Sequence, residues 1–200
     1  MHYQPLNVPP SYPIAAIYKN TAPDPTSPWI MAGNYTVRLT VDGKIFSQPL
    51  IVKMDPRVKT SIVDLQKQHD ISFKAYSLRK QLMSVMDTIQ QWRSQIKLAQ
   101  QTAPADLNNK LKETDAQLSA FMTRDPSNKE ENFEKINSEL SGIFNILQDV
   151  DEPPTSQLLS ASEEAFNSIA PLMKRWNNFR NTQISSINQQ LKATGLPLLK

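Results

Sequence analysis

An uninterrupted run of about forty residues constrains this chain more than any other feature of its sequence. Residues 60–101 contain neither proline nor glycine, so nothing in them breaks a helix. In the second half of the run, apolar side chains recur at steps of three and four residues, the heptad pattern of helices that pack side by side. With a rise of about 1.5 Å per residue the helix would be about 60 Å long, and such a helix needs partners along its apolar stripe. The stripe comprises Leu82, Val85, Ile89, Trp92, Ile96 and Ala99.

The start of this helix carries a capping signal. Thr60 or Ser61 offers an N-cap, and Asp64 stands three residues after Ser61, as in a capping box. Upstream of Leu82 the apolar spacing is less regular, which predicts a local shift of the stripe. The upstream stripe comprises Ile62, Leu65, His69, Phe73 and Tyr76.

A second, shorter helix is predicted after Pro104, with Asp106 as its cap. Its length is about half that of the first helix. The predicted stripe comprises Leu107, Leu111, Thr114, Leu118 and Phe121.

Residues 124–128 interrupt this pattern, and a third helix follows. Ser127 with Glu130, or Asn128 with Glu131, can start it through a capping box. Its stripe comprises Phe133, Ile136, Leu140, Ile143, Leu147 and Val150. Gly142 lies inside this stretch, and a glycine there indicates the close approach of another helix.

The last helix is predicted to start with Thr155 or Ser156 as its cap and to stop at Gly195 and Pro197. Pro171 lies within it and removes one backbone hydrogen bond, which predicts a kink. The predicted stripe comprises Leu159, Phe166, Ile169, Met173, Trp176, Ile184, Ile187 and Leu191.

The helix lengths predict a three-layer, up-down-up bundle with a broken middle layer. The second and third helices, laid end to end, match the first helix and the last. The alternative is a four-helix bundle in which residues 125–128 form a hairpin.

Residues 33–57 predict a β-hairpin instead of a helix. Apolar and polar residues alternate from Tyr35 to Val41, the period of a half-buried strand, and Asp42-Gly43 is a strong signal for a two-residue type I′ turn. With this turn Leu39 faces Phe46 and Tyr35 faces Leu50, so one face is apolar. The apolar face comprises Tyr35, Val37, Leu39, Phe46, Leu50 and Val52.

Prolines punctuate the segment before the hairpin, which predicts an extended leader wrapped over the domain. Its one short strand candidate is 14–18, and Trp29 with Ile30 is expected on the hairpin. Cover for the apolar face is expected from Ile14, Ile17, Tyr18 and Trp29, together with Val58 and Ile62. The predicted fold is α+β but mostly α: a partial immunoglobulin-like β unit in residues 1–58, then an antiparallel helical bundle in residues 59–200.

Composition excludes several classes of function. The net charge of +3 is too small to indicate a nucleic-acid binder. Cysteine is absent and the only histidines are His2 and His69, which argues against thiolate or histidine metal sites and against nucleophilic triads. No apolar run approaches the roughly 18 residues of a membrane span. The start lacks the basic and apolar regions of a signal peptide and is typical of the cut end of a longer chain.

The residues that could carry chemistry have a structural explanation in each case. Glu130-Glu131 and Glu163-Glu164 suit the first turns of helices. His69, beside Asp70, suits a position on the apolar stripe where its ring nitrogens find hydrogen-bond partners. Trp92 and Trp176 suit the core. A basic cluster suits a solvated face, and the alternatives are pairing with Asp55 and Asp64 or contact with a partner. The cluster comprises Lys53, Arg57, Lys59 and Lys67. We therefore predict no catalytic, cofactor-binding or metal site, no cofactor, and no enzyme activity.

The hairpin resembles a known family. The stretches PWIMAGNYTVRLTVDGK (28–44), SQPL (47–50) and VKMDPRV (52–58) are similar to the C-terminal region of large bacterial sortilin-like β-propeller proteins, which carry Asp-box (BNR) repeats and a glycosyl hydrolase label. DVDEPPT (149–155) and LKATGLP (191–197) are also similar. In that family the hairpin closes an immunoglobulin-like unit and long helices end the chain. The propeller and its Asp-boxes are absent here, so no catalytic residue carries over.

This resemblance implies a non-catalytic accessory or interaction module of a larger exported bacterial protein, periplasmic or extracellular, whose partner is its own N-terminal propeller. One alternative is a coiled-coil adaptor that binds a partner helix. Another is a carbohydrate-associated module of a glycoside hydrolase. Because an isolated hairpin leaves strand edges open, self-association through the β edge is also predicted.

Overall fold

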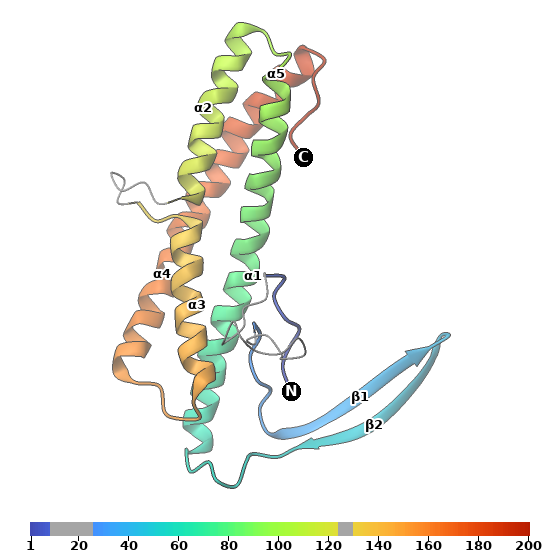
Figure 1. Cartoon of the computed structure of the whole chain (residues 1–200), viewed down its shortest axis with the longest axis vertical. Helices are drawn as coiled ribbons and strands as arrows, with labels where there is room; N and C mark the ends of the chain where they lie inside the picture. The colour runs from blue at the N-terminus through green and yellow to red at the C-terminus, as the bar shows by residue number, and fades with distance from the viewer. Residues whose placement is uncertain (9–25, 124–129) are drawn as a thin grey trace, which may run out of the picture. The chain divides into compact units, whose positions relative to one another are not determined.

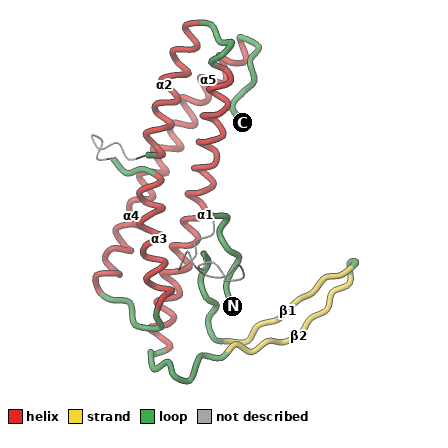
Figure 2. Tube along the Cα trace, viewed as in Figure 1, coloured by secondary structure: helices red, strands yellow, loops and turns green. Residues whose placement is uncertain are grey.

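The computed structural model describes residues 1–8, 26–123 and 130–200, and it confirms the predicted fold class. The chain is mostly helical with one small antiparallel β unit (Figures 1 and 2). It forms two compact units: residues 1–76 with 144–156, and residues 77–143 with 157–200. None of the three divisions between the units falls at residue 58, where the sequence predicts one. No helix among the described residues is both long enough and apolar enough to cross a membrane.

The hairpin forms in the predicted register. Strand β1 (Gly33–Val41) pairs antiparallel with β2 (Lys44–Val52), and Leu39 lies opposite Phe46 as Tyr35 lies opposite Leu50. The turn residues Asp42 and Gly43 have φ values of 48° and 76°, the positive range that a type I′ turn requires.

The described parts of the leader pack against the first long helix. Residues 1–3 run antiparallel to residues 28–30, with an isolated bridge between His2 and Trp29. Trp29 therefore pairs with His2 and not with the hairpin. The hydroxyl of Tyr76 donates to the carbonyl of Gln4 at 2.7 Å, and Leu6 is buried. The strand predicted at 14–18 lies outside the described residues.

Helix α1 (Ile62–Ala99) begins with Ser61 as its N-cap, as predicted. The Asp64 amide donates to Ser61 Oγ at 3.1 Å, and Ser61 Oγ donates to Asp64 Oδ2 at 2.7 Å. Along the second half, every predicted stripe residue is buried except Val85, which is half-buried.

The stripe predicted for the first half of α1 is correct at Leu65 and Tyr76, which are buried, and wrong at the other positions. Ile62 and Phe73 are exposed, and His69 is only half-buried. Apart from Tyr76, the buried positions there still follow heptad spacing, but three of them are polar. They are Leu65, Gln68, Ser72, Ala75, Arg79 and Leu82. The sequence pattern missed Gln68, Ser72 and Arg79 because it counts apolar residues only, whereas a polar side chain can be buried when it finds hydrogen-bond partners.

Helices α2 (Ala105–Met122) and α3 (Phe133–Asp149) form the interrupted layer, and both start where the capping predictions did not place them. Pro104 occupies the N-cap of α2, so Asp106 lies in the first turn. The side chain of Asn132 caps α3 by accepting from the Lys135 amide at 2.9 Å. Ser127 and Asn128 lie outside the described residues. The predicted stripes are buried apart from Val150, which is exposed.

Polar contacts within the second unit order its layers. Arg93 of α1 pairs with Asp115 of α2 at 2.7 Å, while Arg79, earlier on α1, donates to Asn137 of α3 at 3.3 Å. The later residue of α1 thus contacts α2, and the earlier residue of α1 contacts α3. Helices α2 and α3 therefore follow one another in the same direction, antiparallel to α1. This is the three-layer arrangement with a broken middle layer.

The third layer comprises α4 (Ser156–Phe179), the π-helix η1 (Arg180–Ile184) and α5 (Ser185–Ala193). Buried residues step 3-4-3-4-3 along α4, then five residues separate Phe179 from Ile184, and the steps resume in α5. The extra residue of a π-turn explains the break, because it brings Ile184 into the core instead of Gln183. The buried residues are Ser162, Ala165, Ile169, Leu172, Trp176, Phe179, Ile184, Ile187 and Leu191.

The sequence predicts a kink at Pro171 and a helix end at Gly195, and the structure bears on the two differently. Helix α4 runs unbroken through Pro171, and the predicted kink stays a prediction. Gly195, with φ of 72°, ends α5 as predicted. Its amide donates to the Lys192 carbonyl, and the Leu196 amide donates to the Leu191 carbonyl at 2.9 Å, which is the Schellman pattern.

Gly142 is not a point of close approach. It is exposed, and a Cβ atom added to it would meet nothing within 4 Å. We therefore expect Gly142→Ala to raise the free energy of unfolding by about 0.5–1 kcal/mol, because alanine loses less backbone entropy in a helix. Urea denaturation of the two proteins measures the difference. A loss of stability in the alanine protein would contradict this expectation.

Candidate interaction surface

The apolar face of the hairpin is exposed, contrary to the half-buried strands predicted. Its outer part leaves Val37 49%, Leu39 58% and Phe46 57% exposed. Nearer the base, Tyr35, Leu50 and Val52 are half-buried, and the Tyr35 hydroxyl donates to the Met31 carbonyl at 2.7 Å. An exposed patch of contiguous apolar side chains is typical of a surface that meets another molecule.

The predicted cover of this face is not observed among the described residues. Trp29 is 49% exposed and Ile62 is 61% exposed, so neither is buried against another surface. Ile14, Ile17 and Tyr18 lie outside the described residues. The two-residue turn predicted the correct register, and alternation predicted which side chains share a face. Neither signal says whether the apolar face has a covering element.

A hollow of roughly 610 Å³ lies at the base of the hairpin within the first unit. Apolar side chains line much of it, including Trp29, Met54, Ile62 and Leu65, and Gln68 and His69 also contribute. Gln68 donates to the carbonyls of Leu147 and Val150 at the end of α3. The buried amide therefore satisfies carbonyls that the helix itself leaves free.

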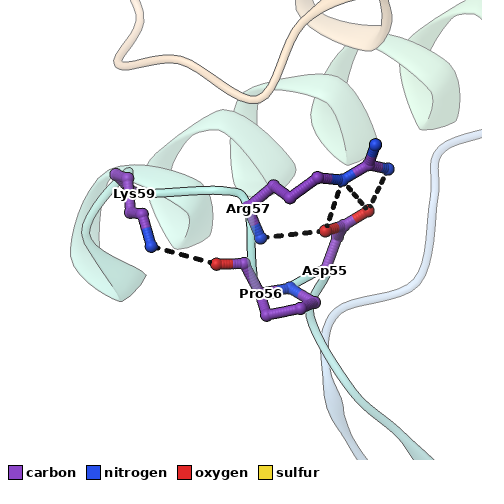
Figure 3. A network of polar contacts seen from close by, with 4 residues as sticks. All are labelled: Asp55, Pro56, Arg57 and Lys59. Carbon is purple, nitrogen blue, oxygen red and sulfur yellow. Dashed lines mark hydrogen bonds and ion pairs between the residues drawn. The ribbon is translucent and has the colours of Figure 1, made fainter.

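The basic cluster at the junction of β2 and α1 is exposed. Figure 3 shows two of its members, Arg57 and Lys59, with their polar contacts. Arg57 pairs with Asp55 through two guanidinium nitrogens, with a closest distance of 2.6 Å, and Lys59 donates to the Pro56 carbonyl at 3.1 Å. These hydrogen bonds lower the pKa of Asp55 and raise the pKa of Arg57. Lys53 and Lys67 are exposed. Such surface pairs contribute little to stability, so the cluster gives no built site.

His69 lies in an aromatic group. Its ring stacks on Phe73 with centroids 6.0 Å apart, and its Nε2 lies 3.4 Å from the Tyr3 hydroxyl. Nδ1 lies 3.3 Å from Asp70. This face of α1 contacts Tyr3 of the leader. His69 and Phe73 therefore follow the spacing of a buried stripe although they do not lie on the face that packs in the bundle.

The carboxylate pairs do not occupy first helical turns as predicted. Glu130 and Glu131 precede α3, where Arg175 of α4 pairs with Glu130 at 3.0 Å and Lys135 pairs with Glu131 at 2.7 Å. Glu163 and Glu164 lie in the interior of α4 and are exposed. Among the described residues, no group of three or more acidic or histidine side chains is placed to hold a metal ion.

The two seam tryptophans belong to the core, as predicted. Trp92 and Trp176 stack with centroids 5.5 Å apart, and Phe121, Phe133 and Phe179 surround Trp176. The Trp92 indole nitrogen is buried without a hydrogen-bond partner among the described residues. Neither ring is available as a platform for stacking a ligand.

Arg79 is the buried charge that the sequence pattern missed. It is 7% exposed, burial lowers its pKa, and its Nε donates a hydrogen bond to the amide oxygen of Asn137. The signal that could have revealed it is its position, because Arg79 continues the heptad spacing of Gln68, Ser72 and Ala75. It is the last polar residue in this row of buried positions along α1.

No protein-family model matches the chain, and neither the curated proteins nor the solved structures contain a significant match to it.

Proposed function

We propose that this chain is a non-catalytic interaction module of a larger exported bacterial protein, and that the apolar face of its hairpin is the surface it presents. The supporting observation is the exposure of Val37, Leu39 and Phe46 on a two-stranded sheet. A hairpin of two strands is marginal in water unless a further layer covers it. The resemblance to sortilin-like propeller proteins suggests the missing layer: the other strands of an immunoglobulin-like unit in the same larger protein, in the periplasm or outside the cell.

The adaptor alternative is less well supported. A bundle that recruits a partner helix needs an open apolar seam, whereas the seam residues of α2 and the second half of α1 are buried. Six exposed large apolar side chains lie on the two hairpin strands instead: Val37, Leu39, Val41, Ile45, Phe46 and Ile51.

Binding to the separately produced upstream region of the parent protein tests this proposal. We expect the 200-residue chain to bind that region, and the double variant Leu39→Asp, Phe46→Asp to bind at least about tenfold more weakly, because two charges would be buried in an apolar contact. Thr40→Asp with Ile45→Asp is the matched control, since this cross-strand pair lies on the opposite face. Isothermal titration measures all three affinities.

Failure to bind the upstream region would overturn the proposal. An equal loss in both double variants would also do so, because the effect would then not belong to the apolar face. A coding region that holds no upstream domain would refute the larger-protein part directly.

A further inference from the structure

We propose that the outer edge of β1 pairs with the same edge of a second copy of this chain, which joins two hairpins into one four-stranded antiparallel sheet. This inference rests on the proposed function, in which the hairpin is the interaction surface. It concerns the edge of the sheet, whereas the proposed function concerns its apolar face, so one hairpin can use both.

The turn determines which backbone groups point outward. Val41 and Lys44 flank the two-residue turn and form the hydrogen-bonded closing pair. Hydrogen-bonded and non-hydrogen-bonded pairs then alternate along the ladder, and residues of the second kind direct their amide and carbonyl groups away from the partner strand. On β1 the outward residues are Asn34, Thr36, Arg38 and Thr40; on β2 they are Ile45, Ser47, Pro49 and Ile51.

The two edges are not equivalent. Pro49 has no amide hydrogen and stands at an outward position, so the donor row of β2 is interrupted in its middle. The outer edge of β1 has a complete row of donors and acceptors. Among the described residues no third strand pairs with either edge. A partner strand therefore finds its full set of hydrogen bonds on β1.

The β1 edge is complementary to itself in one register. When Thr36 lies opposite Arg38 of the second copy, all four outward residues of each strand form hydrogen-bonded pairs, with about eight backbone bonds in total. The two Val37 side chains then face each other on the two-fold axis, and Tyr35 lies opposite Leu39 of the second copy. Both are favourable cross-strand pairs on the apolar face.

Charge repulsion favours this register over the adjacent one that is centred on Arg38. Arg38 is the one charged residue of β1, and a shift that opposes Arg38 to Arg38 of the second copy would place like charges side by side. The register centred on Val37 avoids that contact. It also brings the acidic tip residue Asp42 of each copy to the base of the other hairpin, which carries Lys53. Edge pairing buries little surface, so we expect a dimer that dissociates on dilution.

Disulfide trapping tests the pairing directly, because the natural chain has no cysteine. Directly opposite residues at a non-hydrogen-bonded pair have Cα atoms about 4.5 Å apart, which a disulfide can span. We expect Val37→Cys to form a covalent dimer on mild oxidation. Gln48→Cys is the matched control: it faces Val37 across the hairpin, on the same face but one strand further from the two-fold axis. We expect it to stay monomeric under the same conditions.

A proline pair tests which edge is used without a new covalent bond. Thr36→Pro removes an outward donor of β1, and Ser47→Pro removes one from β2, while neither position donates within the hairpin. Analytical ultracentrifugation should give a dimer dissociation constant at least about tenfold higher for Thr36→Pro than for the natural chain and Ser47→Pro, because a strand edge without its donor loses pairing. Nuclear Overhauser contacts between Leu39 and Phe46 verify that each hairpin still forms.

A natural chain that stays monomeric at every concentration, or equal trapping of the two cysteine variants, would overturn the inference. If that chain nevertheless binds the upstream region through its apolar face, the proposed function stands and only the second copy is rejected. If neither association occurs, both proposals fail.

Discussion

Deletion of Lys174 is expected to lower the free energy of unfolding by at least about 4 kcal/mol, whereas deletion of Asn181 should change it by less than about 1 kcal/mol. Both residues are exposed and lie on one continuous helical layer. Deletion within α4 rotates every later residue by about 100°, so Trp176 and Phe179 could not stay in the core together with Ile169.

Deletion within η1 has the opposite consequence for register. With Asn181 removed, Ile184 follows Phe179 by four residues, and the buried positions step 3-4 without interruption from Ser162 to Leu191. The π-turn can then become an ordinary α-turn with the same core. Thermal and urea denaturation of the two deletion proteins measure the effect. Comparable destabilisation by both would show that the π-turn does more than absorb one residue.

Trp176→Ala should destabilise the chain by about 3–5 kcal/mol, because it empties the centre of the aromatic cluster. Trp176 is 2% exposed, and its ring contacts those of Trp92, Phe121, Phe133 and Phe179 at centroid distances between 5.5 and 6.1 Å. These neighbours come from α1, α2, α3 and α4, so one side chain joins all three layers of the second unit.

Trp29→Ala is the matched control for this substitution. It removes an equally large side chain, but one that is half exposed and stacks only on His2 among the described aromatic residues. We expect a loss below about 1 kcal/mol in urea denaturation. If the two alanine variants were equally stable, the aromatic cluster would not be the centre of the core.

The elements that the sequence predicts well are those whose signals are local. Asp42-Gly43 fixes the hairpin turn and hence the pairing of Leu39 with Phe46, and Ser61 with Asp64 fixes the start of α1. Each depends on a few neighbouring residues and on backbone conformations that only some residue types adopt.

The features that the sequence missed depend on partners far away in the chain. Gln68 is buried because the end of α3 offers it two carbonyls, and Arg79 because Asn137 accepts its hydrogen bond. In the sequence, Ile184 follows Phe179 by five residues. This spacing becomes a π-turn only because the surrounding core buries both side chains. Exposure of the hairpin face depends on which elements cover it, and alternation carries no information about that.

The proline on the outer edge of β2 also limits how far such sheets can grow. A strand with two complete edges can add copies on both sides, and repeated addition gives a fibre. Here Pro49 leaves one side of the hairpin unable to extend the ladder. In the dimer that we propose, a single partner would occupy the β1 edge. The exposed hairpin can therefore take part in assembly and still give a closed particle of fixed size, so a chain with Pro49 replaced by a residue that carries an amide hydrogen would lose that stop.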